Sequence, residues 1–308
     1  MRHDRNGFAT LIVVMCCLLE VLTSDVIAQT SSSSPSDRIA FDRPEAWAMK
    51  YFTSATSLSG LATPDQLSPG SLAIQFEGGW LPALSASQEL VGFNGTAPED
   101  LNMAPVFLRP RVAVGLPHST TLIVAVDPPI RTFGVTPRLL ALGLEGIIHD
   151  ASPWIFGWRA HGQIGTVTAA FTCPANVVSF PPGSPNNPTG CTAESSDSTA
   201  LRYAGVEFHA ARRIGQRLVP HAAAGVNVVD NLFQTNAQTF GQPDHTRLQS
   251  AGATFSISAG VGYMVTERLT LSADVFYAPL TVRRTAETAT SIDSMFNVRA
   301  LFSYRVTR

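Results

Sequence analysis

Apolar and polar side chains alternate with a period of two through most of the chain after residue 70. Near the C-terminus Phe255, Ile257 and Val261 alternate with Ser256 and Ser258. Successive side chains of a strand point to opposite faces, so this pattern predicts strands with one apolar and one polar face. The segments that show it are 71–80, 106–116, 120–127, 138–149, 154–172, 200–213, 218–229, 255–265, 269–277 and 296–306.

The connections between these segments alternate between long and short. The long ones are 83–105, 127–137, 173–199, 235–250 and 284–291, and the short ones are 117–119, 150–153, 214–217 and 266–268. Transmembrane barrels of bacteria have short turns on the periplasmic side and longer loops outside. The sequence therefore predicts an all-β fold, a closed antiparallel transmembrane β-barrel of about ten strands, within a range of about 8–12.

Composition argues against the alternative fold, a soluble β-sandwich or lipocalin-like barrel, in which the apolar faces would point inward. Charged residues make up 14% of the chain and hydrophobic residues 45%, whereas soluble domains carry about 25% charge. No segment after the first 28 residues is apolar over a length that would span a membrane as a helix. A closed barrel then satisfies every backbone group in lipid. The net charge of −2, with no basic stripe, argues against a nucleic-acid partner.

The first 70 residues divide into two parts ahead of the barrel at 71–308. Residues 1–28 have a basic start, an apolar core and small residues at Val26 and Ala28, which predicts a cleaved secretory signal peptide. Residues 29–70 are predicted to form a periplasmic linker with a short helix that begins near Pro44. We expect this helix outside the barrel, packed on its rim; the inner membrane surface and insertion into the barrel mouth are the alternatives.

The arrangement of residues 71–308 resembles the small outer-membrane β-barrels of Gram-negative bacteria, the OmpA/OmpX-like kind. The final segment, Met295–Val306, is similar to the C-terminal strand that the barrel-assembly machinery recognises, although Thr307 and Arg308 stand where an aromatic residue is usual. The resemblance implies an outer-membrane location, contact with outer-membrane lipid and assembly by that machinery. It is a resemblance of architecture, so it brings no functional residues with it.

The polar face of the strands would form the lumen of such a barrel. It gathers charged and imidazole side chains of both signs, namely Glu77, Arg109, Arg111, Asp127, Glu145, Arg159, His161, Glu207, His209, Arg213, Asp274 and Arg299. The interior of a barrel little wider than eight strands is mostly filled by side chains, and buried charges need partners. The network is therefore interpreted as a salt-bridged filling or as a narrow polar pore that selects solutes.

Two further features of the sequence, a pair of histidines and the absence of enzyme motifs, bear on metal binding and catalysis. His161 and His209 would approach each other if the hairpin between their strands were centred near residue 186, but two histidines make an incomplete ligand set for a metal. No zinc spacing, phosphate loop or nucleophile elbow is present. No metal, cofactor or catalytic residue is predicted, and a membrane-embedded hydrolase is only the third functional hypothesis.

Cys173 and Cys191 are the only cysteines that remain after the signal peptide, and they bracket a loop rich in proline and asparagine. In an exported protein this spacing predicts a disulfide.

The leading functional hypothesis is passage or binding of a small solute at the outer membrane. The alternative is a non-conducting structural barrel or one whose loops interact with the surroundings.

Overall fold

The computed structural model describes residues 36–61, 67–102, 104–285 and 287–307. The predicted signal peptide, residues 1–28, lies outside these ranges. Within them no helix has the length and hydropathy needed to cross a membrane.

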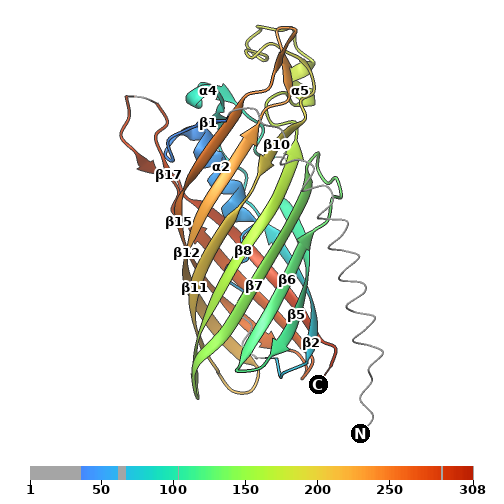
Figure 1. Cartoon of the computed structure of the whole chain (residues 1–308), viewed down its shortest axis with the longest axis vertical. Helices are drawn as coiled ribbons and strands as arrows, with labels where there is room; N and C mark the ends of the chain where they lie inside the picture. Colours follow the sequence, from blue (N-terminus) through green and yellow to red (C-terminus); the bar gives the residue numbers. More distant parts are fainter. Residues whose placement is uncertain (1–35, 62–66, 103, 286, 308) are drawn as a thin grey trace. The chain divides into compact units, whose positions relative to one another are not determined.

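Ten strands form a closed antiparallel barrel, as predicted (Figure 1). The last strand pairs with the first, from Val298 opposite Trp80 to Arg305 opposite Ala73, and this pairing closes the wall. The wall strands are β2 (Leu72–Trp80), β5 (Val106–Leu116), β6 (Thr120–Asp127), β7 (Thr136–Ala151), β8 (Trp154–Ala169), β11 (Tyr203–Arg212), β12 (Leu218–Gln234), β15 (Arg247–Met264), β16 (Leu269–Ala278) and β19 (Met295–Arg305). A short strand, β10 (Asp197–Ala200), continues the line of β11 toward the long loops, because both pair with β8 in one register.

The two faces of the wall differ as the alternation predicts. In β5, Arg109 and Arg111 are buried in the lumen, whereas Val106 and Leu108 on the other face are exposed. The outer face carries a wide surface of large apolar side chains, among them Ile74, Phe76, Leu142, Phe156, Ile164, Phe208, Val228, Phe255, Ile257, Val275, Phe296 and Phe302. An apolar surface of this extent is suited to lipid and not to water.

The long connections carry small elements at one end of the barrel (Figure 1). They are α3 (Ala86–Glu89), β3 (Leu90–Val91), α4 (Gly92–Gly95), β4 (Ala97–Pro98), α5 (Ala175–Val178), β9 (Cys191–Ala193), β13 (Ala237–Thr239), β14 (Gln242–Asp244), β17 (Thr281–Val282) and β18 (Ser291–Ile292). Cys173 and Cys191 form the predicted disulfide. It closes a loop whose cross-link should stabilise the fold by about 3 kcal/mol in the chain-entropy account.

The helix α2 (Pro44–Ala55) lies inside the barrel, and the prediction that it packs outside on the rim was wrong. Trp47, Tyr51 and Ala55 pack among lumen side chains that include Leu201 and Phe276. The helix is buried on nearly all sides, and a helix without an exposed polar face is stable only in a protein interior.

The chain reaches this position from the long-loop end. The strand β1 (Asp37–Arg38) pairs in parallel with β15 at Leu248 and Gln249, near the start of that strand. The chain then runs down the lumen through α2 and residues 56–61. At the short-turn end β2 begins at Leu72, whose N–H bonds to Thr307. The segment 36–61, called the plug below, therefore enters at the long-loop rim and lies in the lumen from Pro44 onward, and does not form a periplasmic linker.

Candidate functional site: the plugged lumen and its outer cavity

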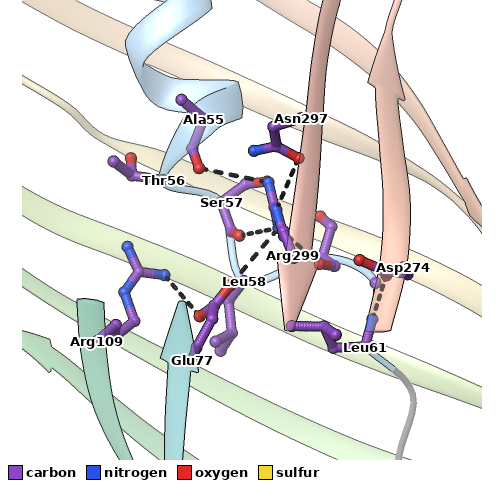
Figure 2. A network of polar contacts seen from close by, with 12 residues as sticks. Ala55, Thr56, Ser57, Leu58, Leu61, Glu77, Arg109, Asp274, Asn297 and Arg299 are labelled. Carbon is purple, nitrogen blue, oxygen red and sulfur yellow. Dashed lines mark hydrogen bonds and ion pairs between the residues drawn. The ribbon is translucent and has the colours of Figure 1, made fainter. Parts of the chain in front are cut away.

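Arg299 of β19 holds the end of α2. Its guanidinium donates to the carbonyl oxygens of Ser54 at 2.9 Å, Ser57 at 2.8 Å and Ser59 at 2.8 Å (Figure 2). The last carbonyls of a helix have no partner within the helix, and the C-terminal end of its dipole favours a cation. Arg299, which is fully buried, supplies both the donors and the charge.

Arg159 of β8 likewise binds backbone carbonyl groups of the residues that follow α2. It donates to the carbonyl oxygens of Leu58 at 3.2 Å and Gly60 at 2.7 Å. The lumen thus contacts successive peptide groups of the plug with positively charged donors.

Lumen oxygens accept the N–H groups of the same residues. The Leu58 N–H donates to the Tyr203 hydroxyl at 2.6 Å, that of Gly60 to Glu207 at 2.8 Å, and that of Leu61 to Asp274 at 2.7 Å. Because these contacts are made to backbone atoms, they fix the path of the chain at residues 58–61 independently of its side chains. Buried peptide groups need such partners, and the barrel supplies them.

The partners of the plug belong to a wider network of ion pairs. Glu77 pairs with Arg111 and lies 3.8 Å from Arg109 and 3.9 Å from Arg299. Arg109 pairs with Asp127 at 2.8 Å. A second group joins Arg159 to Glu145 at 2.9 Å and to Glu207 at 3.1 Å. Each charge therefore has the partner that burial demands.

Most of the charged residues predicted for the lumen lie there. The exception is Arg213, which follows the end of β11 and pairs with Asp150 at 2.6 Å on the exposed rim at the short-turn end. The lumen set comprises Glu77, Arg109, Arg111, Asp127, Glu145, Arg159, His161, Glu207, His209, Asp274 and Arg299.

The predicted approach of His161 to His209 does not occur. The β8–β11 register places His161 opposite Gly205 and His209 opposite Gly157, so the two histidines lie four positions apart along the pair. His161 contacts the Tyr203 ring edge-on, with 5.4 Å between centroids. Within the described ranges, no group of three or more His, Cys, Asp or Glu side chains is arranged to hold a metal.

The plug side of the site was not predicted from the sequence. Lys50, the only lysine of the chain, is buried on α2 and donates to the carbonyl oxygens of Phe41 at 2.6 Å and Thr281 at 2.7 Å. Asn231 of β12 donates to Met49 O at 3.2 Å and Thr53 Oγ1 at 2.7 Å. The isolated lysine in an arginine-rich chain was the one available signal. Nothing in residues 56–61 marks their backbone as a ligand.

A cavity of about 580 Å³ remains beside α2 in the outer half of the barrel. Tyr51 and Phe52 of the helix face Leu139, Val167 and Leu201 across it. Its size is within the range of about 300–1,000 Å³ that is usual for small-molecule sites, and such sites are mainly apolar.

A smaller cavity of about 230 Å³ lies between α2 and the long loops. Glu99 lines it, and one of its carboxylate oxygens has no hydrogen-bond partner. Burial, and to a smaller degree the nearby charge of Asp197, raises the pKa of Glu99 to about 8. A carboxyl in this setting is stabilised in its neutral form.

An apolar outer face, a polar lumen and a closed ring of antiparallel strands define the fold of an outer-membrane β-barrel. Solved structures of this class are similar in fold. The outer-membrane protease OmpT of Escherichia coli is 10% identical, with a TM-score of 0.42 over 81% of this chain and 100% of that chain. The translocator domain of the autotransporter NalP of Neisseria meningitidis is also 10% identical, with a TM-score of 0.38 over 83% and 93%.

The attachment invasion locus protein Ail of Yersinia pestis is 11% identical, with a TM-score of 0.31 over 77% of this chain and 98% of that chain. No protein-family model and no curated protein matches the sequence. At these identities the activities of the similar structures do not transfer, so function has to be argued from the plug and the cavity.

Proposed function

We propose that this protein is a plugged, non-conducting barrel that binds a small apolar solute in the cavity beside α2. The cavity of about 580 Å³ between the plug and the wall carries this proposal. Binding of a solute fits a lumen occupied by residues 44–61, and free passage of a solute does not.

The contacts of the plug support a closed resting state. Its backbone is hydrogen-bonded to side chains of β8, β11, β16 and β19, so a continuous water path would require several buried contacts to break together. Each of these contacts involves a charged group, and bonds to charged groups are worth about 1.5–3 kcal/mol each. Spontaneous opening should therefore be rare.

The apolar lining supports the class of solute. Tyr51, Phe52, Leu139, Val167 and Leu201 offer aromatic and aliphatic surface, and a polar solute would lose its hydrogen bonds to water there without replacing them. A purely structural barrel, the second candidate, has no need of such a cavity. We place the protein in the outer membrane, exported through the predicted signal peptide and inserted by the barrel-assembly machinery.

Two measurements on folded protein in detergent and in planar bilayers test the proposal. The full chain should be silent in conductance, and a variant lacking residues 36–61 should show discrete channels. A naphthalene-sized apolar compound should raise the unfolding temperature of the full chain, because a ligand that binds only the folded state stabilises it. Steady conductance by the full chain would overturn the plugged state, and an unchanged unfolding temperature would overturn solute binding.

Leu139→Trp and Leu142→Trp are matched variants for the binding arm. Leu139 lines the cavity and is buried, whereas Leu142 lies on the outer face of the same strand and is 48% exposed. The compound should stabilise the Leu142→Trp protein as it does the natural one, and should leave the Leu139→Trp protein unchanged. Equal stabilisation of both would place the binding elsewhere.

A further inference from the structure

The ladder between β5 and β6 ends before the strands do. The two strands pair from Leu116 opposite Thr120 to Arg111 opposite Ala125. Beyond that point β5 pairs only with β2, up to Val106 opposite Trp80, and β6 pairs only with β7. Residues 106–110 therefore have a strand neighbour on one side, and the wall has a gap there.

Prolines lie on both sides of this gap. Pro105 and Pro110 belong to the β5 side, and Pro128 and Pro137 to the side of β6 and β7. An unpaired backbone N–H is costly in lipid, and proline has none. The four prolines reduce the number of donors that an opening in the wall would leave without partners.

The cavity beside α2 extends through this gap. Its lining includes Phe76 and Leu108, which lie on the outer face of the wall and are 45% and 67% exposed. The same lining includes Leu139 and Leu201, which are buried in the lumen. One cavity therefore contacts both the lipid-facing surface and the interior. On the lumen side, the pair of Arg109 and Asp127 spans the two strands in place of backbone bonds.

The gap lies at the long-loop end of the wall, the end that faces outward in transmembrane barrels of bacteria. The eleven residues of β5 are about the length that a tilted strand needs to cross a bilayer. Leu116 is at the short-turn end, so residues 106–110 lie toward the long loops. Ile130 and Phe133, in the long connection that follows β6, are 65% and 56% exposed. Apolar side chains therefore lie on the connection that borders the gap.

We propose that the gap between β5 and β6 admits a single hydrocarbon chain from the outer leaflet into the cavity beside α2. This inference rests on the proposed solute binding and names its ligand class and its route. The route is apolar from Leu108 on the outer face to Leu139 in the lumen, so the chain would move from lipid to protein without meeting water. A polar solute arriving from the aqueous side would have no use for an opening toward lipid.

Photolabelling of the full-length mature protein in phosphatidylcholine vesicles tests the route. The probe is a fatty acid with a diazirine near the end of its chain, and the labelled residues are mapped by mass spectrometry. We expect adducts on lumen-side residues of the cavity, such as Tyr51 and Leu139. The Leu139→Trp variant should lower labelling of Tyr51 at least five-fold, and Leu142→Trp should leave it unchanged. Val167→Phe, a second filling variant, should lower it if Leu139→Trp does not fold.

The outcomes separate the route from the proposed function. Adducts confined to outer-face residues such as Leu108 and Leu142 would overturn lateral access. If an apolar compound still stabilised the protein in that case, solute binding would stand without the membrane route. A second arm carries the diazirine on one chain of phosphatidylcholine. Lumen adducts in that arm assign the chain to a membrane lipid, and lumen adducts from the fatty acid alone assign it to a single-chain amphiphile.

Discussion

The central and outer parts of the lumen hold the same inserted segment in opposite ways. In the centre, the polar clamp of Arg159, Tyr203, Glu207, Asp274 and Arg299 bonds to the backbone of residues 54–61. In the outer part, α2 packs largely through apolar side chains, with polar bonds at Lys50 and Asn231, and leaves a cavity of about 580 Å³. The polar bonds of the clamp fix the position of the chain, whereas the apolar contacts leave an unfilled cavity beside α2.

The difference has an energetic basis. A buried ion that loses its partner costs about 3–5 kcal/mol, because nothing replaces the lost bonds. An apolar side chain at the edge of a cavity has few neighbours to lose, since dispersion depends on close contact. Substitutions in the clamp should therefore have larger effects than substitutions in the outer layer.

The largest effect is expected for Arg299→Ala. It removes the donors to Ser54, Ser57 and Ser59 and a charge near Glu77. The free energy of unfolding in detergent, measured with denaturant, should fall by about 3–5 kcal/mol. Planar bilayers should record intermittent channel openings. Arg305→Ala, on the same strand near the short-turn end, is the control and should remain silent; equal effects of both would refute a specific clamp.

Gly60→Ala should come next. Gly60 has a φ of +73°, and an added Cβ would lie 2.4 Å from Asp274 Oδ2. Gly70, with a φ of +80° and open space around it, is a matched control for the backbone strain alone. Each variant should lose about 1 kcal/mol of stability from the left-handed conformation, and Gly60→Ala should lose about 1–2 kcal/mol more. Denaturant unfolding of the two variants measures the difference. Equal losses of stability would show that Asp274 moves aside without an energetic penalty.

Phe52→Ala tests the outer layer. Phe52 is half-buried, lines the large cavity and contacts Phe171 with 5.3 Å between ring centroids. The loss of stability should stay below the value of about 3 kcal/mol at which well-packed Phe→Ala substitutions begin. The variant should not conduct, because the clamp is intact. A conducting Phe52→Ala protein would mean that apolar packing also seals the lumen.

A pH dependence of stability is expected at Glu99. Its pKa of about 8 in the folded protein lies above the ordinary value of 4.5. The folded state therefore binds the proton more tightly than the unfolded state, and stability should decline as pH rises from about 4.5 to about 8. Glu99→Gln should remove this part of the pH dependence of the unfolding midpoint, and Glu194→Gln, on the exposed surface, should keep it. If the unfolding midpoints of the natural protein and of Glu99→Gln changed with pH in parallel, the result would contradict a raised pKa at Glu99.

The wall was predictable because the alternation of apolar and polar side chains reports which face of each strand is buried. The period of two gave the ten strands, their inward faces and the order of long and short connections. It failed where apolar residues are scarce: β15 begins at Arg247, but the prediction started at 255, since Ser250, Gly252 and Ala253 give little contrast between faces.

The plug was not predictable on the same grounds. Residues 56–61 are bound through peptide groups, which every residue has, so the sequence of this stretch resembles an ordinary linker. The facing of Arg159 and Arg299 could be predicted, but not that their donors would be used by the chain's own N-terminal part. The histidine pair failed for a different reason, since a small change in the hairpin register moves two side chains apart.

The position of Arg299 has a consequence for how the protein folds. Arg299 lies on β19, the last strand, and its contact with Ser57 joins residues 242 positions apart. Contacts of such long sequence separation form slowly, because the chain between them must first be ordered. β19 also closes the wall against β2. The strand that closes the wall is thus also the strand that holds the plug, so closure of the barrel and binding of the N-terminal segment depend on the same element.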